Sequence, residues 1–299
     1  MASAPLCSLA HTEEEHGVVS RQFQRAITTW ISACVLRYRP CAPRKACRVL
    51  VAPAKRRALK ISIIIPAFNE ERLLGETLAR IRDASEVFRT EGWDCEWIVC
   101  DNNSTDRTAE IARAAGATVV FEPVNQIARA RNRGAAAASG DWLLFIDADS
   151  HPSRELTADV VGQIKSSRCL AGGSTVRLEA GYPRANLVTH FWNGVSRARR
   201  LLAGSFIFCE ATSFREVGGF SNELFAGEEL ELSARLHALA RQTGKRIVIL
   251  HRHPLMTSAR KMRLYKGREL VWFFIRAAFN RKGTLTKREA CQPWYDGRR

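Results

Sequence analysis

The sequence predicts an α/β protein built on one mostly parallel sheet with helices on both faces. Three observations lead to this fold class. Short unbroken apolar runs, such as residues 61–65 and 142–146, are typical of strands that are buried on both faces. Stretches with apolar residues at helical spacing separate these runs along residues 60–150. Such alternation favours parallel strands joined by right-handed crossovers.

Residues 60–150 contain the regular part of this alternation. Four strands are predicted from short apolar runs, at 61–65, 97–100, 118–121 and 142–146. Three helices lie between them, at about 71–90, 107–115 and 127–138. Pro66 ends the first strand because proline has no backbone N–H to donate. Asp106 is a favourable N-cap for the second helix, and Gly116 follows its last turn.

The alternation is less regular after residue 150. Helices are predicted near 154–165, 185–201 and 228–242, and strands near 171–178, 205–209 and 247–250. The last predicted helix, at about 267–279, is rich in Trp and Phe and is flanked by Arg and Lys. It fits either a terminal helix that packs on the sheet or an interfacial helix at a membrane surface.

We expect one folded domain between two basic segments. The domain is predicted at residues 59–255, with a first half at 59–150 and a second half at 151–255. Residues 1–58 are expected to form a poorly ordered leader, or to lie outside the native protein if the start codon was assigned too early. Residues 256–299 form a basic C-terminal extension that carries the aromatic helix.

The net charge of +16 is concentrated at the two ends of the chain. Residues 1–60 hold 11 Lys and Arg against 3 Asp and Glu, and residues 251–299 hold 13 against 3. Residues 61–250 hold 22 against 24. This near-neutral middle argues against nucleic acid as a partner, because a nucleic-acid-binding face combines basic residues with aromatic ones. The basic ends are either solvated or lie against an anionic membrane surface.

The cysteines and the apolar runs bear on the compartment. The 9 Cys are scattered, and no two of them form a C-x-x-C pair. This pattern is typical of reduced thiols in a cytoplasmic protein rather than of disulfides or a zinc site. No apolar run reaches the roughly 20 residues of a membrane-spanning helix. We therefore expect a cytoplasmic protein, with peripheral attachment to the inner face of a membrane as the alternative.

Polar side chains follow three of the predicted strands. Asn69 and Glu70 come after the first strand, Asp101 after the second, and Asp147 and Asp149 after the fourth. The carboxyl ends of parallel strands meet at one edge of the sheet, so these side chains can converge on one ligand. Two carboxylates so close together need a positive partner, and Mg²⁺ or Mn²⁺ that carries substrate phosphates supplies one. The pattern predicts a metal–nucleotide site.

Four motifs carry these polar residues or lie between them. They are IIIPAFNE at 63–70, VCDNNSTD at 99–106, ARNRG at 130–134 and FIDAD at 145–149. In this order and spacing they resemble the family 2 nucleotide-sugar glycosyltransferases, which have the GT-A fold. The resemblance covers about residues 60–250, and it is specific to the superfamily but not to one donor or acceptor. It implies a GT-A type, Rossmann-like sheet in a single catalytic domain.

The resemblance implies a role for each polar residue. Four residues would line the pocket for the nucleoside and its base: Pro66, Asn69, Glu70 and Asp101. Asp147 would contact the ribose or the metal, and Asp149 would hold the metal that bridges the two phosphates. Arg129 or Arg133 would reach the diphosphate. Their helix can equally present these arginines to solvent.

The resemblance also implies a catalytic base at the start of the helix near residue 228. Relatives carry a Glu-Asp pair there, and this chain carries Glu228 and Glu229. We favour Glu229 as the base that takes the acceptor's proton, with Glu228 as the alternative. Acidic residues also stabilise a helix N-terminus without any catalytic role. His253, which follows the strand at 247–250, would help to bind the metal or the diphosphate, and it can equally be a surface residue.

The predicted activity is metal-dependent transfer of a sugar from a UDP- or GDP-sugar to a hydroxyl of a carbohydrate or lipid-linked acceptor, with inversion. Two alternatives stay open. A sugar-nucleotide nucleotidyltransferase would need a Gly-rich loop with a basic residue after the first strand, where this chain has PAFNE at 66–70. A non-catalytic nucleotide-sugar-binding protein is compatible with the changed acidic pair.

Overall fold

The computed structural model describes residues 58–179, 183–202, 204–258, 281–291 and 295. The leader predicted at 1–58, except for its last residue, and the aromatic helix predicted at 267–279 lie outside these described residues. Among the described helices, none is both long enough and apolar enough to cross a membrane.

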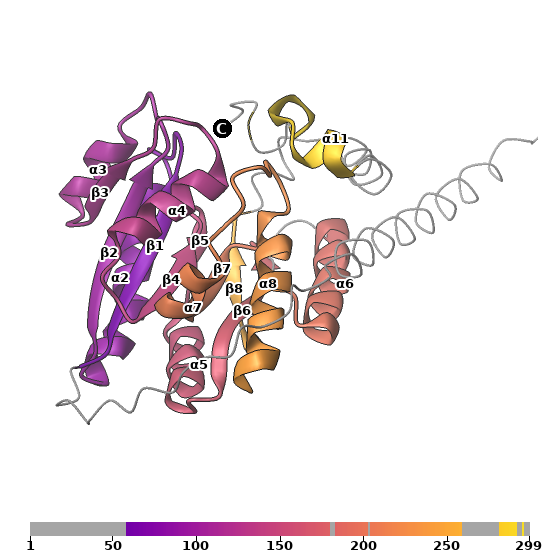
Figure 1. Cartoon of the computed structure of the whole chain (residues 1–299). Coiled ribbons are helices and arrows are strands. Elements are labelled where there is room, and N and C mark those ends of the chain that lie inside the picture. The colour runs from indigo at the N-terminus through magenta and orange to yellow at the C-terminus, as the bar shows by residue number, and fades with distance from the viewer. Residues whose placement is uncertain (1–57, 180–182, 203, 259–280, 292–294, 296–299) are drawn as a thin grey trace, which may run out of the picture.

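One eight-stranded sheet runs through the described part of the chain (Figure 1). Its strands lie in the order β3-β2-β1-β4-β7-β6-β8-β5. Their bounds are β1 Lys60–Ala67, β2 Asp94–Asp101, β3 Thr118–Phe121, β4 Trp142–Ile146, β5 Ser150–His151, β6 Cys169–Leu178, β7 Phe206–Glu210 and β8 Arg246–Thr257.

The sheet is parallel in its first half and mixed in its second half. β1 pairs in parallel with β2 and β4, and β2 pairs in parallel with β3. β7 runs antiparallel to both β4 and β6, whereas β6 and β8 are parallel. The short β5 is antiparallel to β8. The predicted α/β class is confirmed, and four of these seven neighbouring pairs are parallel.

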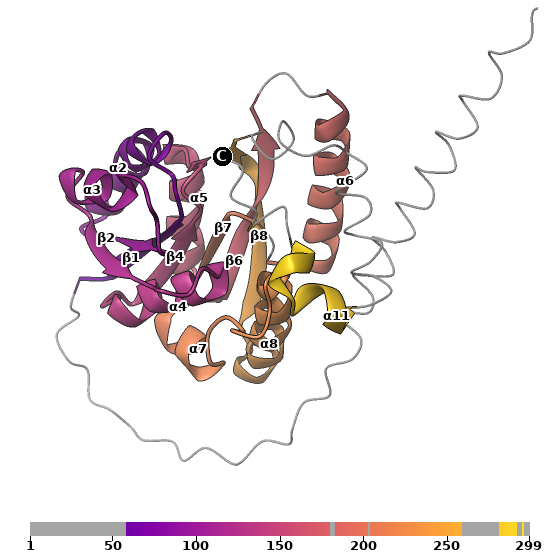
Figure 2. The same ribbon diagram turned by 90° about the horizontal axis from the view of Figure 1, so that it is seen from above.

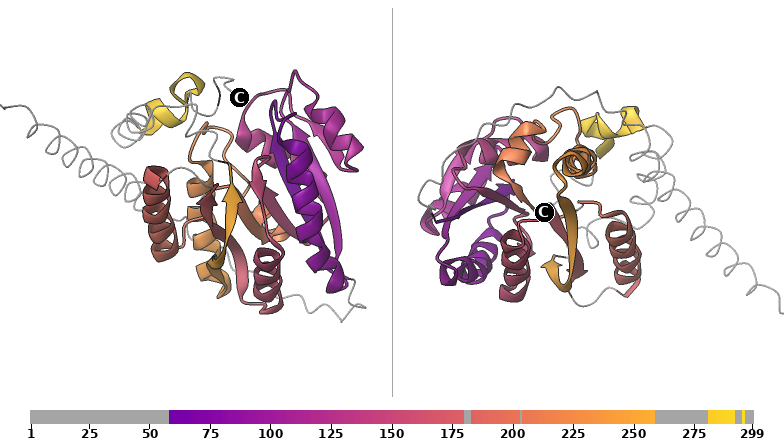
Figure 3. Two further views of the ribbon diagram at one scale, coloured as in Figure 1. Left: turned by 180° about the vertical axis from the view of Figure 1, so that it is seen from behind. Right: turned by 60° about the horizontal axis from the view of Figure 1, so that its bottom comes forward.

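Helices cover both faces of the sheet (Figures 2 and 3). One face carries α2 (Leu74–Thr90), α3 (Thr108–Ala114) and α5 (Arg154–Lys165). The other face carries α4 (Ile127–Ala137), α7 (Ala211–Glu216) and α8 (Glu228–Thr243). The helix α6 (Pro183–Arg199) lies beside the outer strands, where it contacts β6 and β8. The short α11 (Arg281–Leu285) and the 3₁₀ helix η1 (Arg288–Cys291) pack near the start of α8.

The two faces of the sheet belong to two apolar cores. In the second core, the rings of Phe145, Phe214 and Phe220 form a cluster with centroid separations of 5.1–5.6 Å. Burial of each such ring contributes about 1.5–3 kcal/mol to folding. This cluster joins β4 to α7 and to the loop before α8, so it fixes the part of the chain that leads to Glu228.

Three features of the second half differ from the sequence-based expectation. The strand predicted to end at Leu250 continues to Thr257, and α7 and β5 were not predicted. The residues that follow Leu250 read as a loop because His251 and Arg252 are polar and exposed. The strand nevertheless continues, because Leu255, Met256 and Thr257 pair again with β6 after an irregularity that begins at Leu250.

Register places three polar loops at one edge of the sheet. Ala67 at the end of β1 lies opposite Asp101 at the end of β2. Ile64 lies opposite Phe145, so Asp147 follows β4 at the level of the last residues of β1. The predicted convergence of the three loops is therefore present in the fold.

Candidate active site

The loops after β1 and β2 are joined by hydrogen bonds. The backbone N–H of Asn69 donates to Ser104 Oγ at 3.0 Å, and the N–H of Thr105 donates to Asn69 Oδ1 at 2.8 Å. Asn69 has a φ of 52°, a left-handed conformation that Asn tolerates better than most residues. The N–H of Ser104 donates to Asp101 Oδ1 at 3.0 Å. Asn69 and Asp101, which were predicted to bind the nucleoside, therefore lie in two loops that hydrogen bonds join.

Two further predicted nucleoside residues support these loops. Pro66 is buried in β1 opposite Cys100. Glu70 is buried, and its N–H donates to Thr108 Oγ1 at 2.8 Å. Thr108 is the first residue of α3, so this bond ties the loop after β1 to the start of that helix.

Asn102 positions the loops around the candidate site, and the sequence interpretation did not select it. It is 4% exposed. Its Nδ2 donates to the carbonyl oxygens of Glu122 and Val124, and its Oδ1 accepts from the N–H of Gln126 at 2.9 Å. These bonds hold the loop between β3 and α4 against the end of β2. They therefore set where α4 begins.

Arg131 is the centre of the site, and the sequence interpretation did not select it. The residue is 1% exposed, and its guanidinium contacts three carboxylates from two distant segments. Nη2 lies 2.9 Å from Asp147 Oδ1, and Nη1 lies 3.0 Å from Glu228 Oε1 and 3.2 Å from Glu229 Oε1. One guanidinium therefore joins the loop after β4 to the start of α8.

The helical period of α4 explains why Arg131 faces inward. Ala128 and Ala135, three residues before and four residues after Arg131, are buried on the same face. An arginine on that face needs opposite charge, because an unpaired buried cation is costly. This position in the apolar stripe was the signal in the sequence that could have identified Arg131.

The cluster carries more negative than positive charge. Burial raises the pKa of Glu228, and the neighbouring charge of Glu229 raises it further. Burial alone would lower the pKa of Arg131, but the charges of Asp147, Glu229 and Glu228 raise it well above its usual range. One guanidinium among three carboxylates leaves an environment that favours an added cation.

The predicted metal residues lie where β4 ends. The N–H of Asp147 donates to the carbonyl of Ser205 at 3.2 Å, which joins this loop to the start of β7. The carbonyl of Asp149 accepts from the N–H of Ser258 at 3.1 Å. Both carboxylates are half-buried. The described residues contain no group of three or more His, Cys, Asp or Glu that could hold a metal ion.

Arg129, Arg133 and His253 were also predicted as site residues. Among the described residues, no recorded hydrogen bond or ion pair joins their side chains to the Arg131 cluster. Arg129 Nε donates to Gln126 Oε1 at 3.0 Å, and Arg133 is exposed. His253 Nδ1 lies 3.0 Å from Asp159 Oδ2 on α5. This contact belongs to the face of the sheet that α5 covers.

Comparison with known proteins places the chain in a family. Residues 62–215, just over half of the 299, match the model of glycosyl transferase family 2. The chain is 32% identical over 124 residues to a dolichol-phosphate mannosyltransferase of Pyrococcus furiosus, and the match covers 39% of this chain and 33% of that protein. It is 27% identical over 244 residues to the glycosyltransferase AglE of Haloferax volcanii, with 74% and 77% covered.

Solved structures show the same fold. The mannosyltransferase PcManGT of Pyrobaculum calidifontis, solved with GDP-Man and Mn²⁺, superposes with a TM-score of 0.56 at 19% identity, over 93% of this chain and 77% of that one. TarS of S. aureus superposes with a TM-score of 0.53 at 19% identity, over 79% and 78%. Several curated relatives, including the P. furiosus enzyme, are matched over about a third of their length. Because the family model spans more than half of its residues, this chain belongs to glycosyl transferase family 2.

Proposed function

We propose that the protein transfers a sugar from a nucleotide diphosphate sugar to an acceptor hydroxyl. One observation carries this proposal: Arg131 holds Asp147 and the Glu228–Glu229 pair around a single guanidinium. Asp147 belongs to the loop predicted to hold the donor's metal and ribose. The acidic pair is predicted to serve the acceptor. A transferase needs these two functions side by side, because the acceptor oxygen must attack the carbon that carries the nucleotide.

The donor is a UDP- or GDP-sugar in this proposal. Four residues from the connected loops after β1 and β2 would surround the nucleoside: Pro66, Asn69, Glu70 and Asp101. The relatives support this donor class, because PcManGT was solved with GDP-Man and TarS with UDP-GlcNAc. The acceptor is a carbohydrate or a lipid-linked molecule, as the name of the dolichol-phosphate mannosyltransferase indicates for that relative.

Asp149, with Asp147, would hold Mg²⁺ or Mn²⁺. The metal would supply charge neutralisation for the departing nucleoside diphosphate. The donor set fits such an ion, since hard oxygen ligands from one or two carboxylates are typical of these metals when a substrate provides phosphates. PcManGT was solved with Mn²⁺, which supports the same class of cofactor here.

Glu229 is the base in this proposal, and Glu228 is a positioning residue. The side chain of Glu229 is 19% exposed, whereas that of Glu228 is 2% exposed. A base must reach the hydroxyl proton, so the more accessible carboxylate is better placed. Glu229 would take this proton as the acceptor oxygen attacks from the side opposite the diphosphate, which inverts the anomeric centre. Glu228 would hold Arg131 in place.

Hydrolysis and transfer assays with radiolabelled UDP- and GDP-sugars and Mn²⁺ test this proposal. Asp149→Asn should lower turnover by about 100-fold or more, while Asp159→Asn, a carboxylate on α5 that pairs with His253, should stay near wild type. Glu229→Gln should lower transfer but leave nucleotide affinity unchanged. Full transfer by Asp149→Asn without added metal would contradict the proposal. NMR of the product tests inversion.

One observation favours a second candidate function. Glu229 Oε1 lies 3.2 Å from Arg131 Nη1, so this oxygen is already engaged in an ion pair and is not free to accept a proton from an acceptor hydroxyl. The chain would then bind nucleotide sugars without transferring them. Calorimetry that gives tight UDP-sugar or GDP-sugar binding, with no turnover over a broad acceptor panel, would support this second function.

A further inference from the structure

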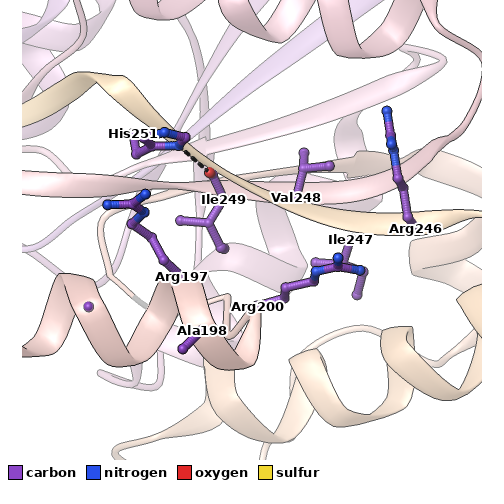
Figure 4. Close-up of a pocket in the computed structure, with 9 residues that line it drawn as sticks. Arg197, Ala198, Arg200, Arg246, Ile247, Val248, Ile249 and His251 are labelled. Atoms are coloured by element: carbon purple, nitrogen blue, oxygen red, sulfur yellow. Dashed lines mark hydrogen bonds between the residues drawn. The ribbon is translucent and has the colours of Figure 1, made fainter.

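A groove lined by arginine side chains runs between α6 and β8, on the outer flank of the sheet (Figure 4). It consists of two adjoining cavities of 550 Å³ and 460 Å³. Gly194, Arg197 and His251 line both cavities. We call this the basic groove.

The basic groove concentrates positive charge without compensation. Four arginines and two histidines line it: Arg177, Arg197, Arg200 and Arg246, with His190 and His251. No Asp or Glu occurs among the described residues that line the two cavities. Figure 4 shows Arg197 extending from α6 toward the strand that carries His251, and Arg200 lying beside Ile247. Arg246 stands at the far end of the same cavity.

Some cations elsewhere in the described residues are paired: Arg131, Arg154 and Arg235 each form an ion pair with a carboxylate. The cations of the basic groove form no ion pair within the described part of the chain. A cluster of like charges is unfavourable by itself, so its presence in a cavity indicates a site for an anion.

The walls of the basic groove are fixed by hydrogen bonds. The side chain of Asn193 accepts from the N–H of Val176 at 3.0 Å and donates to its carbonyl at 2.8 Å, which holds α6 against β6. The imidazole of His237 on α8 lies 2.9 Å from the carbonyl oxygen of Arg200. These hydrogen bonds hold α6, and with it Arg197, in place at the wall of the basic groove.

The basic groove lies away from the candidate active site. β8 is three strands from β4 in the sheet, which corresponds to about 14 Å between strand axes. Arg246 also lies at the opposite end of the strands from Asp147, because Ala171 pairs with both Ile247 and Cys209, and Cys209 pairs with Leu143 at the start of β4. The Arg246 end of the basic groove is therefore separated from Asp147 both across the sheet and along the strands.

We propose that the basic groove binds a phosphate-bearing organic anion. Arg197, Arg200 and His251 hold the phosphate, since guanidinium groups give strong, oriented bonds to phosphate oxygens. The uncharged part of the ligand lies along the second cavity, against Val176, Thr189 and Pro254. The volume of the two cavities exceeds what a single phosphate fills, which favours an organic phosphate over the inorganic ion.

Gly194 provides a variant that fills the groove without disturbing the core. A Cβ added there meets no atom within 4 Å, so Gly194→Glu places a carboxylate among the cations and leaves the packing unchanged. Gly162 on α5 has the same open surroundings, and Gly162→Glu is the matched control for charge and for loss of a helical glycine. Thermal melting of both variants checks that they fold.

Binding is measured on the full chain in EDTA, which removes the divalent ion that the proposed donor site needs. The probes are glycerol phosphate by calorimetry and vesicles of phosphatidylcholine with or without phosphatidylglycerol by co-sedimentation. Wild type and Gly162→Glu should bind a phosphate-bearing probe, and Gly194→Glu should lose about tenfold or more in affinity. Binding of glycerol phosphate assigns a soluble ligand, and binding only of phosphatidylglycerol vesicles assigns a lipid headgroup. Equal binding by the two variants, or no binding by wild type, overturns the proposal.

Discussion

At the scale of single residues, the site depends on one buried cation. Arg131 is nearly inaccessible and neutralises part of a cluster of three carboxylates. Burying such a group costs several kcal/mol in lost hydration, which the contacts with its partners offset. The ring of Phe220, 5.2 Å from the guanidinium carbon, adds a cation–π contact. The charge balance of the site therefore changes if Arg131 is replaced.

Arg131→Met should lower the free energy of unfolding by about 3–5 kcal/mol, because it leaves buried carboxylates without their cation. Urea unfolding followed by circular dichroism measures this loss. Arg154→Met is the control, since Arg154 forms an exposed ion pair with Asp83 and should change stability by less than about 1 kcal/mol. Equal unfolding midpoints for the two variants would show that the buried network does not hold α4, β4 and α8 together.

Glu228→Gln should alter the dependence of stability on pH. The pKa of Glu228 is raised in the folded protein, by burial first and by the charge of Glu229 second. Between its ordinary value near 4.5 and this raised value, the folded state binds the proton more tightly than the unfolded state does. Wild type should therefore lose stability through Glu228 as pH rises across that window.

Gln carries no proton to lose, so the Glu228→Gln variant should gain stability relative to wild type as pH rises from about 5 to about 8. Denaturant unfolding at several pH values gives both curves. Parallel curves for wild type and variant would contradict the assigned direction of the pKa.

At the scale of elements, the sequence predicted most strands and helices because their apolar spacing is regular. β1, β2 and β4 were recognised from unbroken apolar runs. The sequence did not show the direction of β7. A fully buried strand has the same unbroken apolar run whether it is parallel or antiparallel to its neighbour. The six residues of α7 are too few for a period to emerge.

The packing of α4 on β1 depends on one glycine. A Cβ at Gly134 would lie 2.4 Å from Cγ2 of Ile64, a fully buried side chain with a branched and therefore stiff Cβ. Gly134→Ala should destabilise the protein by about 1–3 kcal/mol, because overpacking outweighs the better helix propensity of Ala. Gly162→Ala on α5, where a Cβ meets nothing, should instead stabilise by about 0.5–1 kcal/mol. Chemical denaturation of the pair separates the two effects, and a stabilised Gly134→Ala would contradict the close approach.

At the scale of the whole molecule, the sequence predicted which polar loops lie together, because the order and direction of parallel strands alone determine this. Parallel strands bring Asn69, Asp101 and Asp147 to one edge whatever the loops do. The contact of Arg131 with Glu228 joins positions 97 residues apart, and it requires α8 to dock beside α4. The basic groove likewise arises only when α6 lies against β8. Neither follows from a local pattern of residues.

The proposed metal site should be completed only when a nucleotide is present. The proposed ligands are only two carboxylates, Asp149 and Asp147, so Mn²⁺ alone should bind weakly. A nucleoside diphosphate supplies the missing oxygen ligands, and ligands that bind the folded state raise its stability in proportion to their binding. Mn²⁺ with UDP or GDP should therefore raise the melting temperature by more than the separate effects of the two added together.

Thermal melting in EDTA, in Mn²⁺, in nucleotide and in both gives this comparison for three proteins. Wild type should show the synergy, and Asp149→Asn should lose it. His253→Ala should keep it, because His253 pairs with Asp159 on the face that α5 covers. Loss of the synergy in His253→Ala would instead make His253 a metal ligand, and the part of β8 that carries it would then have to approach Asp149 when the nucleotide binds. Preference for UDP or GDP in the same experiment identifies the base that the loops after β1 and β2 accept.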